Sequence, residues 1–215
     1  MHRARQHAEA RTRERRTRLA HEAARLMAEG GIRDYRQAKR KAADRLGIHD
    51  DASLPRNREI EEALREYQRL FLGARQPREL RSRREAALQA MEFLARFEPR
   101  LVGPVLEGTA DASTPVSVQL FSDDADAVAR FLDEAGIPAE ARSRRLRLDR
   151  TREAECPLWL FAAQDLAFEL TVLPSLALRQ APLSTVDEKP MKRASAAQLR
   201  QLLEEEEVPA YDAAD

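Results

Sequence analysis

The spacing of apolar residues changes near residue 98, and this change most limits the folds open to the chain. Before residue 98, apolar residues recur every three or four positions, which is typical of amphipathic helices. After it, apolar and polar residues alternate in several short segments, which is typical of half-buried strands. The sequence therefore predicts an α+β fold, with an N-terminal helical bundle followed by a small mixed β-sheet with flanking helices.

Four helices are expected before residue 98. Glycines end the first three, at Gly30-Gly31, Gly47 and Gly73, and Pro77 sits as the first residue of the fourth. Residues 1–18 hold seven arginines and almost no apolar face, so we expect a basic arm that frays or stays disordered in isolation. Residues 19–97 would then form the helical domain.

Residues 98–207 are expected to form an α/β domain, and residues 208–215 a mobile tail. Alternating segments predict strands over 116–121, 139–149, 157–163 and 166–173, with a tight hairpin turn at Gln164-Asp165. An acidic helix is expected over 123–135. Ser195 and Gln198 have capping-box spacing and predict the start of a last helix.

The charge of the chain is unevenly distributed. Residues 1–100 hold 25 Lys and Arg against 16 Asp and Glu, and residues 101–215 hold 12 against 21, so net charges of +9 and −9 cancel. Opposite signs favour two surfaces with different partners, including a protein partner on the acidic half, or halves that attract each other. No stretch reaches about 20 uncharged apolar residues, and Cys156 is the single cysteine. We therefore expect a soluble, cytoplasmic protein with no membrane partner.

The stretch from Gly103 to Phe121 contains two glycines five residues apart, Gly103 and Gly108, then Thr109 and an alternating strand. This arrangement resembles the signature of the polymerase-β-like nucleotidyltransferase superfamily, where Gly-Ser and a second glycine precede an Asp-x-Asp pair on the next strand. Glu169 lies where the superfamily places a third carboxylate. The resemblance covers roughly residues 98–181 and implies a nucleotidyltransferase-like domain of a degenerate, carboxylate-depleted bacterial kind.

The departures from that signature concern catalysis. The position of the loop serine is Pro104, and the two aspartates fall on Pro115 and Ser117. Two-metal phosphoryl transfer needs several hard oxygen ligands around its cations, which one glutamate and a hydroxyl do not supply. We therefore expect no catalysis, no metal and no cofactor, and a remnant site that binds a nucleotide, an RNA or a protein. Its residues would be Gly103, Gly108, Thr109, Ser117 and Glu169.

Two alternatives stay open. Basic residues could contact phosphates of RNA or DNA, which would make the Arg-rich N-terminal half a nucleic-acid-binding regulator. The candidate anion contacts are Arg36, Lys39, Arg40 and Lys41 on the second helix, and Arg145 and Arg147 beside Arg142 and Arg144 on a strand. A solvated helix face explains the same charges. The second alternative is an active nucleotidyltransferase, or another transferase, with an atypical site such as Glu169 and Asp165 with Arg179.

Overall fold

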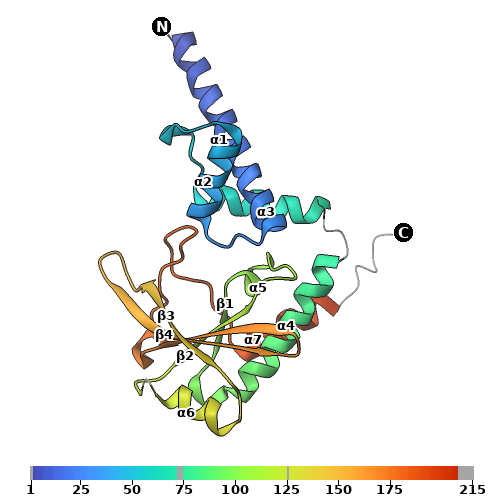
Figure 1. Cartoon of the computed structure of the whole chain (residues 1–215), viewed down its shortest axis with the longest axis vertical. Helices are drawn as coiled ribbons and strands as arrows, with labels where there is room; N and C mark the ends of the chain where they lie inside the picture. The colour runs from blue at the N-terminus through green and yellow to red at the C-terminus, as the bar shows by residue number, and fades with distance from the viewer. Residues whose placement is uncertain (1, 72–74, 125, 208–215) are drawn as a thin grey trace. The chain divides into compact units, whose positions relative to one another are not determined.

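A computed structural model describes residues 2–71, 75–124 and 126–207 (Figure 1). The chain divides into two compact units. The helical unit comprises Met1–Gln76 with Thr185–Asp187, and the sheet unit comprises Pro77–Ser184 and Glu188–Asp215. The division therefore falls between residues 76 and 77, and not near residue 98 as the change in periodicity indicated. The reason is that the fourth helix packs its apolar side into the core of the sheet unit.

The helical unit contains α1 (His2–Gly30), α2 (Tyr35–Leu46), the short 3-10 helix η1 (Asp51–Ser53) and α3 (Asn57–Phe71). Its core combines small and branched side chains, so that α2 and α3 both pack closely against α1. Asp34 caps α2 by accepting a hydrogen bond from the Gln37 backbone N–H at 2.7 Å. Gly47 ends that helix in the left-handed conformation, as predicted.

The Arg-rich start of the chain, expected to fray or stay disordered in isolation, is helical here as part of α1. Helix α1 runs without a break from His2 to Gly30. Its second half is fixed by packing, and adding turns to an existing helix costs far less than starting one. Two side chains also tie the middle of α1 to the loop after α2: Arg15 pairs with Asp50 at 3.3 Å, and Arg16 donates to the Ala52 carbonyl at 2.5 Å.

The sheet unit is built on five strands in the order β1-β2-β5-β4-β3. The strands are β1 (Arg100–Val102), β2 (Val116–Phe121), β3 (Glu140–Arg147), β4 (Glu153–Ala163) and β5 (Leu166–Leu173). The central pair β2 and β5 is parallel and every other pair is antiparallel. Gln164 and Asp165 form the predicted hairpin turn, with φ of 51° and 62°.

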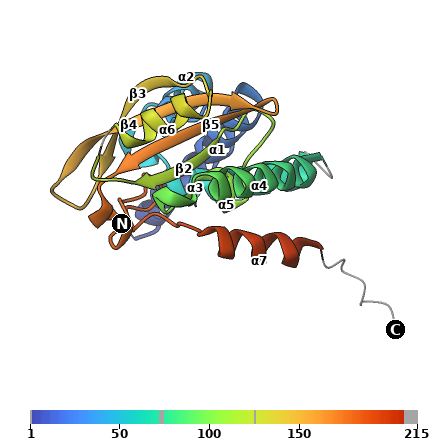
Figure 2. The same cartoon turned by 90° about the horizontal axis from the view of Figure 1, so that it is seen from below.

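One face of the sheet carries the main hydrophobic core. Helices α4 (Arg75–Phe93), α6 (Ala127–Glu134) and α7 (Ala196–Glu207) contribute buried residues to it together with β1, β2 and β5. Figure 2 shows α4 and α7 side by side, where Arg200 pairs with Glu92 at 2.6 Å. Ser195 and Gln198 form the predicted capping box at the start of α7. The short segments η2 (Ala95–Phe97) and α5 (Pro104–Glu107) lie on either side of β1 in the chain.

On the opposite face of the sheet, Phe121, Cys156 and Leu173 form a small apolar cluster at one end, under η3 (Ser175–Leu178). Some element limits differ from the predictions. Helix α4 begins at Arg75, two residues before Pro77, and α6 begins at Ala127 because the Asp123 carboxylate accepts from the Ser175 backbone N–H at 2.9 Å. Residues 208–215, expected as a mobile tail, lie outside the described residues. In the described part of the chain, no helix is long and apolar enough to cross a membrane.

Candidate functional site

Two residues of the expected remnant site, Ser117 and Glu169, lie together on the face of the sheet opposite the main core. Ser117 on β2 and Glu169 on β5 are register partners in the central parallel pair, so their side chains lie on the same face. The Ser117 hydroxyl donates to Glu169 Oε2 at 3.3 Å. Val102, the β1 partner of Ser117, directly precedes Gly103. The glycine loop therefore begins where β1 ends, one strand away from Ser117 and two strands away from Glu169.

Arg144 completes this cluster from the edge strand β3. Its Nη2 lies 2.5 Å from Glu169 Oε2, in an ion pair that spans β4. The side chains are 35% and 18% exposed, so the pair is only partly screened by water. Glu169 is the single acidic residue on β2 and β5. Its negative charge is therefore balanced by a guanidinium, and among the described residues no group of three His, Cys, Asp or Glu could hold a metal ion.

The loop between Gly103 and Gly108 has the backbone that its glycines predict. Gly103 has φ of 72° and precedes α5, and Gly108 has φ of 86° and closes it. Both values lie in the region that favours glycine, so replacing either residue would strain the loop. Pro104 occupies the first position of α5, where its missing N–H costs no hydrogen bond. Thr109 follows as a buried residue.

Two buried arginines of α4, not singled out from the sequence, hold this loop and the segment that follows it. Arg84 donates through Nε to the Val105 carbonyl and through Nη2 to the Leu106 carbonyl, both at 3.0 Å. It also pairs with Glu206 of α7. Burial lowers the pKa of Arg84, and Glu206 opposes that effect. A guanidinium stays charged across the physiological range, so a buried cation supports the carbonyls of α5.

Arg83 fixes the segment that leads from the loop into β2. Its Nε donates to the Thr114 carbonyl at 3.0 Å and its Nη2 to the Ala112 carbonyl at 2.5 Å. The Asp111 carboxylate adds a turn by accepting from the Ser113 backbone N–H at 2.9 Å. The sequence contained one signal for these buried arginines. Arg84 stands four residues after Leu80, so both side chains lie on the buried side of α4.

The arginines of β3 do not form one surface. Because side chains alternate along a strand, Arg142 and Arg144 lie on the face of Glu169, and Arg145 and Arg147 lie on the other. Arg145 and Arg147 are exposed or half-buried and pair with Glu153 at 4.0 Å and Glu188 at 3.0 Å. These arginines were expected to share one anion-binding face, but only Arg144 belongs to the Glu169 cluster.

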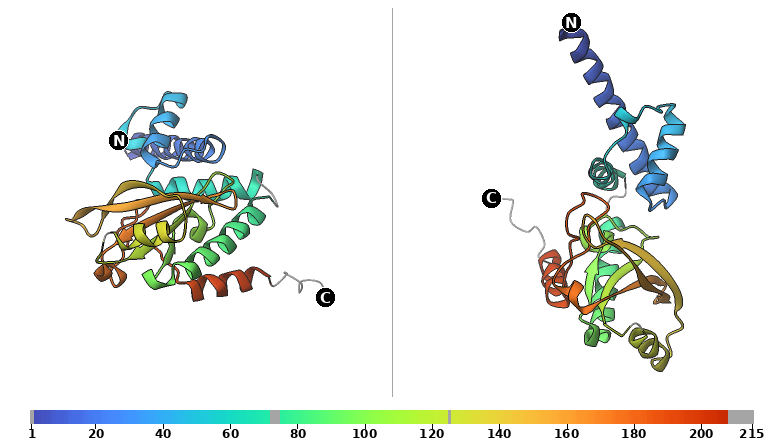
Figure 3. Two further views of the ribbon diagram at one scale, coloured as in Figure 1. Left: turned by 60° about the horizontal axis from the view of Figure 1, so that its bottom comes forward. Right: turned by 90° about the vertical axis from the view of Figure 1, so that its left-hand side faces the viewer.

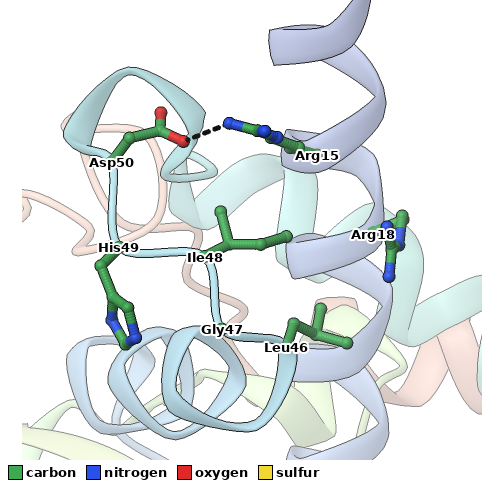
Figure 4. A pocket seen from close by; sticks show the side chains of 7 residues that line it. All are labelled: Arg15, Arg18, Leu46, Gly47, Ile48, His49 and Asp50. Carbon is green, nitrogen blue, oxygen red and sulfur yellow. Dashed lines mark hydrogen bonds and ion pairs between the residues drawn. The ribbon is translucent and has the colours of Figure 1, made fainter.

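In the helical unit, the basic residues of α2 divide by exposure. Arg36, Arg40 and Lys41 are exposed, and Lys39 is half-buried beside Glu59, with its pKa lowered by burial. A hollow of about 640 Å³ lies next to this helix, between α1 and the residues around Gly47. Figure 4 shows the side chains that line it. Its basic groups do not converge, since Arg15 is turned to Asp50 while Arg18 and His49 point in other directions. We therefore do not assign a ligand to the hollow.

Comparisons of the chain with protein-family models, with curated proteins and with solved structures find no match.

Proposed function

We propose that this protein is a non-catalytic, nucleotidyltransferase-like protein that binds a nucleotide on the sheet face around Glu169. The observation that carries the proposal is the ion pair between Glu169 and Arg144. A metal-dependent transferase uses free carboxylates to collect divalent cations. Here the one carboxylate of the central strands is already balanced by an arginine. The cluster therefore offers a cation for an anionic ligand and no free carboxylate group for a metal.

The binding chemistry follows from the side chains present. A guanidinium recognises phosphate through two parallel N–H donors, and it does so without a metal ion. A nucleotide phosphate would compete with Glu169 for Arg144 and accept a further hydrogen bond from the Ser117 hydroxyl. The glycine loop, held by Arg84, follows strand β1, which pairs with the strand that carries Ser117. Binding in this arrangement is independent of Mg²⁺.

Calorimetric titration with ATP, GTP, CTP and UTP, each with Mg²⁺ and with EDTA, tests the proposal. We expect at least one nucleotide to bind equally well under both conditions. Arg144→Gln should weaken binding at least about tenfold, because it removes a charged phosphate contact worth about 1.5–3 kcal/mol. Glu169→Gln should preserve or strengthen it, because it removes the competing carboxylate. Arg145→Gln, on the same strand but the other face, is the matched control and should change nothing.

Two results would overturn the proposal. One is the absence of binding by all four nucleotides. The other is Mg²⁺-dependent incorporation of label from a nucleoside triphosphate that Glu169→Ala abolishes, because this would make Glu169 a catalytic residue of an active transferase.

A further inference from the structure

The first half of α1 is a basic helix. Residues 2–18 hold seven arginines and two glutamates, and all of them belong to one continuous helix. Figures 1 and 3 show that the first turns of α1 extend beyond α2 and α3, the helices against which its second half packs. A charged helix is thus presented to solvent on the helical unit.

Five arginines between residues 11 and 18 divide into two groups. Arg15 and Arg16 are used within the unit, where they contact Asp50 and the Ala52 carbonyl. Arg11, Arg13 and Arg18 are exposed and make no side-chain hydrogen bond or ion pair with the described part of the chain. Figure 4 shows Arg18 pointing away from the Arg15–Asp50 pair. Three arginines of α1 are therefore available to a partner without breaking the bundle.

Their positions around the helix axis fit a groove. At 100° per residue, Arg11 and Arg18 lie about 20° apart, and Arg13 lies on roughly the opposite side. Cations on two opposite sides of one helix can contact the phosphates on both walls of a nucleic-acid groove at once. A flat anionic surface would meet the cations on only one side of the helix. The major groove of B-DNA, about 12 Å wide, admits an α-helix, whereas the deep and narrow major groove of A-form RNA does not.

Single-stranded nucleic acid fits this segment poorly. Proteins that bind single strands usually stack the bases on aromatic side chains. The first aromatic residue of the chain is Tyr35, after the end of α1. The arginine-rich segment therefore offers contacts to a phosphate backbone and none for base stacking.

We propose that the first half of α1 binds duplex DNA by lying in its major groove, with Arg11 and Arg18 contacting one phosphate wall and Arg13 the other. Because these contacts go to phosphates, binding is independent of base sequence and falls steeply with salt. The site belongs to the helical unit and does not depend on the nucleotide site proposed on the sheet.

Fluorescence anisotropy of the full-length protein with labelled duplex DNA of ~20 base pairs, at about 50 and about 200 mM salt, tests this assignment. The triple variant Arg11→Gln, Arg13→Gln and Arg18→Gln should bind at least about 30-fold more weakly at the lower salt. The slope of log K against log salt should become shallower by about 2 to 3, since each lost phosphate contact contributes about 0.9. Circular dichroism should show unchanged helix content, because glutamine forms helices nearly as well as arginine.

A charge-matched control comes from α2. This control variant carries Arg36→Gln, Arg40→Gln and Lys41→Gln. It removes the same number of positive charges, three, from the exposed face of a helix whose other face is buried. This variant should lose less than about threefold in affinity. An equal loss in both triple variants would show a general charge effect and overturn the assignment to α1.

Three further outcomes would also overturn it: no binding of duplex DNA at the lower salt, equal or tighter binding of single-stranded DNA, or equal or tighter binding of duplex RNA. If the α1 triple variant loses helix content, the single variants Arg11→Gln and Arg18→Gln decide, and each should weaken binding at least about threefold. Unchanged affinity in both single variants would count against the proposal. Titration with nucleotides should be unaffected by every α1 variant, which separates this proposal from the one on the sheet unit.

Discussion

Arg144 and Glu169 form an ion pair although a whole strand, β4, lies between the strands that carry them. The register partner of Arg144 on β4 is Cys156, and that of Glu169 is Leu160, so the guanidinium crosses above Leu158. Strand β3 is the edge of the sheet, and its side chains are mostly exposed. The pair therefore connects an edge strand that has little hydrophobic packing to the centre of the sheet.

Removing Arg144 should destabilise the protein measurably. We expect Arg144→Met to lower the free energy of unfolding by about 1–2 kcal/mol, because it leaves the mostly buried Glu169 carboxylate without its cation. Arg142→Met is the control, since Arg142 pairs with Glu140 where both side chains are about 60% exposed, and it should cost less than about 0.5 kcal/mol. Urea denaturation of both variants gives the comparison. Equal losses would mean that the crossing pair adds nothing beyond a surface ion pair.

The arginine that supports the glycine loop should matter more. Arg84→Met leaves the Val105 and Leu106 carbonyls and Glu206 without a donor, and we expect a loss of about 3 kcal/mol. Arg84→Lys should recover little of this, because a single ammonium cannot reach three acceptors in the fork geometry of a guanidinium.

Hydrogen exchange locates the effect of the Arg84 variants. The amides of Gly108 and Thr109, which donate to the Pro104 carbonyl, should exchange faster than in the wild type. Arg58→Met, which removes an exposed i,i+4 pair with Glu62 on α3, is the control and should alter neither stability nor exchange in the loop. Unchanged exchange at Gly108 in Arg84→Met would refute a role for Arg84 in fixing the loop.

Much of the sheet unit could be predicted from local signals. Alternation gave β2 and β5 with their observed limits, and two glycines with left-handed backbone marked the loop before β2. The partners of Glu169 could not be derived in this way. Whether Arg144 or Arg145 reaches Glu169 depends on the register of β3 on β4, and one residue of slip exchanges the two faces.

In the N-terminal half, the local sequence signals were insufficient because the structure depends on what each helix packs against. Residues 1–18 have almost no apolar face and were expected to fray or stay disordered in isolation, but the packed second half of α1 provides a helix nucleus that they can extend. The boundary between the units was misplaced for a related reason. Helical periodicity does not state which core a helix joins, and α4 joins the core of the sheet unit through residues such as Met91 and Leu94.

Substitutions in the turn between β4 and β5 should make the protein more stable. Gln164 and Asp165 both have positive φ, a conformation that Gly adopts without strain and that Asn and Asp tolerate better than Gln. Replacing them together, Gln164→Asn with Asp165→Gly, should raise the free energy of unfolding by about 0.5–1 kcal/mol in urea denaturation. Gln164→Val, a β-branched residue at the same position, should lower it. A loss of stability in the Asn-Gly variant would show that the hydrogen bond from Gln164 to Gln89 outweighs the backbone preference.

The turn between β3 and β4 should make stability depend on pH. The Asp149 carboxylate accepts hydrogen bonds from the backbone N–H groups of Thr151 and Arg152 at 2.9 and 2.8 Å, and these bonds, with the Arg152 side chain, hold the pKa of Asp149 well below its usual range. A carboxylate with a lowered pKa in the folded state stabilises the protein above the unfolded-state pKa of about 4, and this contribution is lost as the pH falls toward the folded-state value. Asp149→Asn should therefore show a smaller drop in melting temperature between about pH 5 and about pH 3 than the wild type.

The control is Asp133→Asn on α6, at an exposed aspartate whose carboxylate makes no hydrogen bond in the described part of the chain, and it should keep the wild-type profile. A wild-type profile in Asp149→Asn as well would mean that the turn bonds are no stronger to the carboxylate than to the neutral amide.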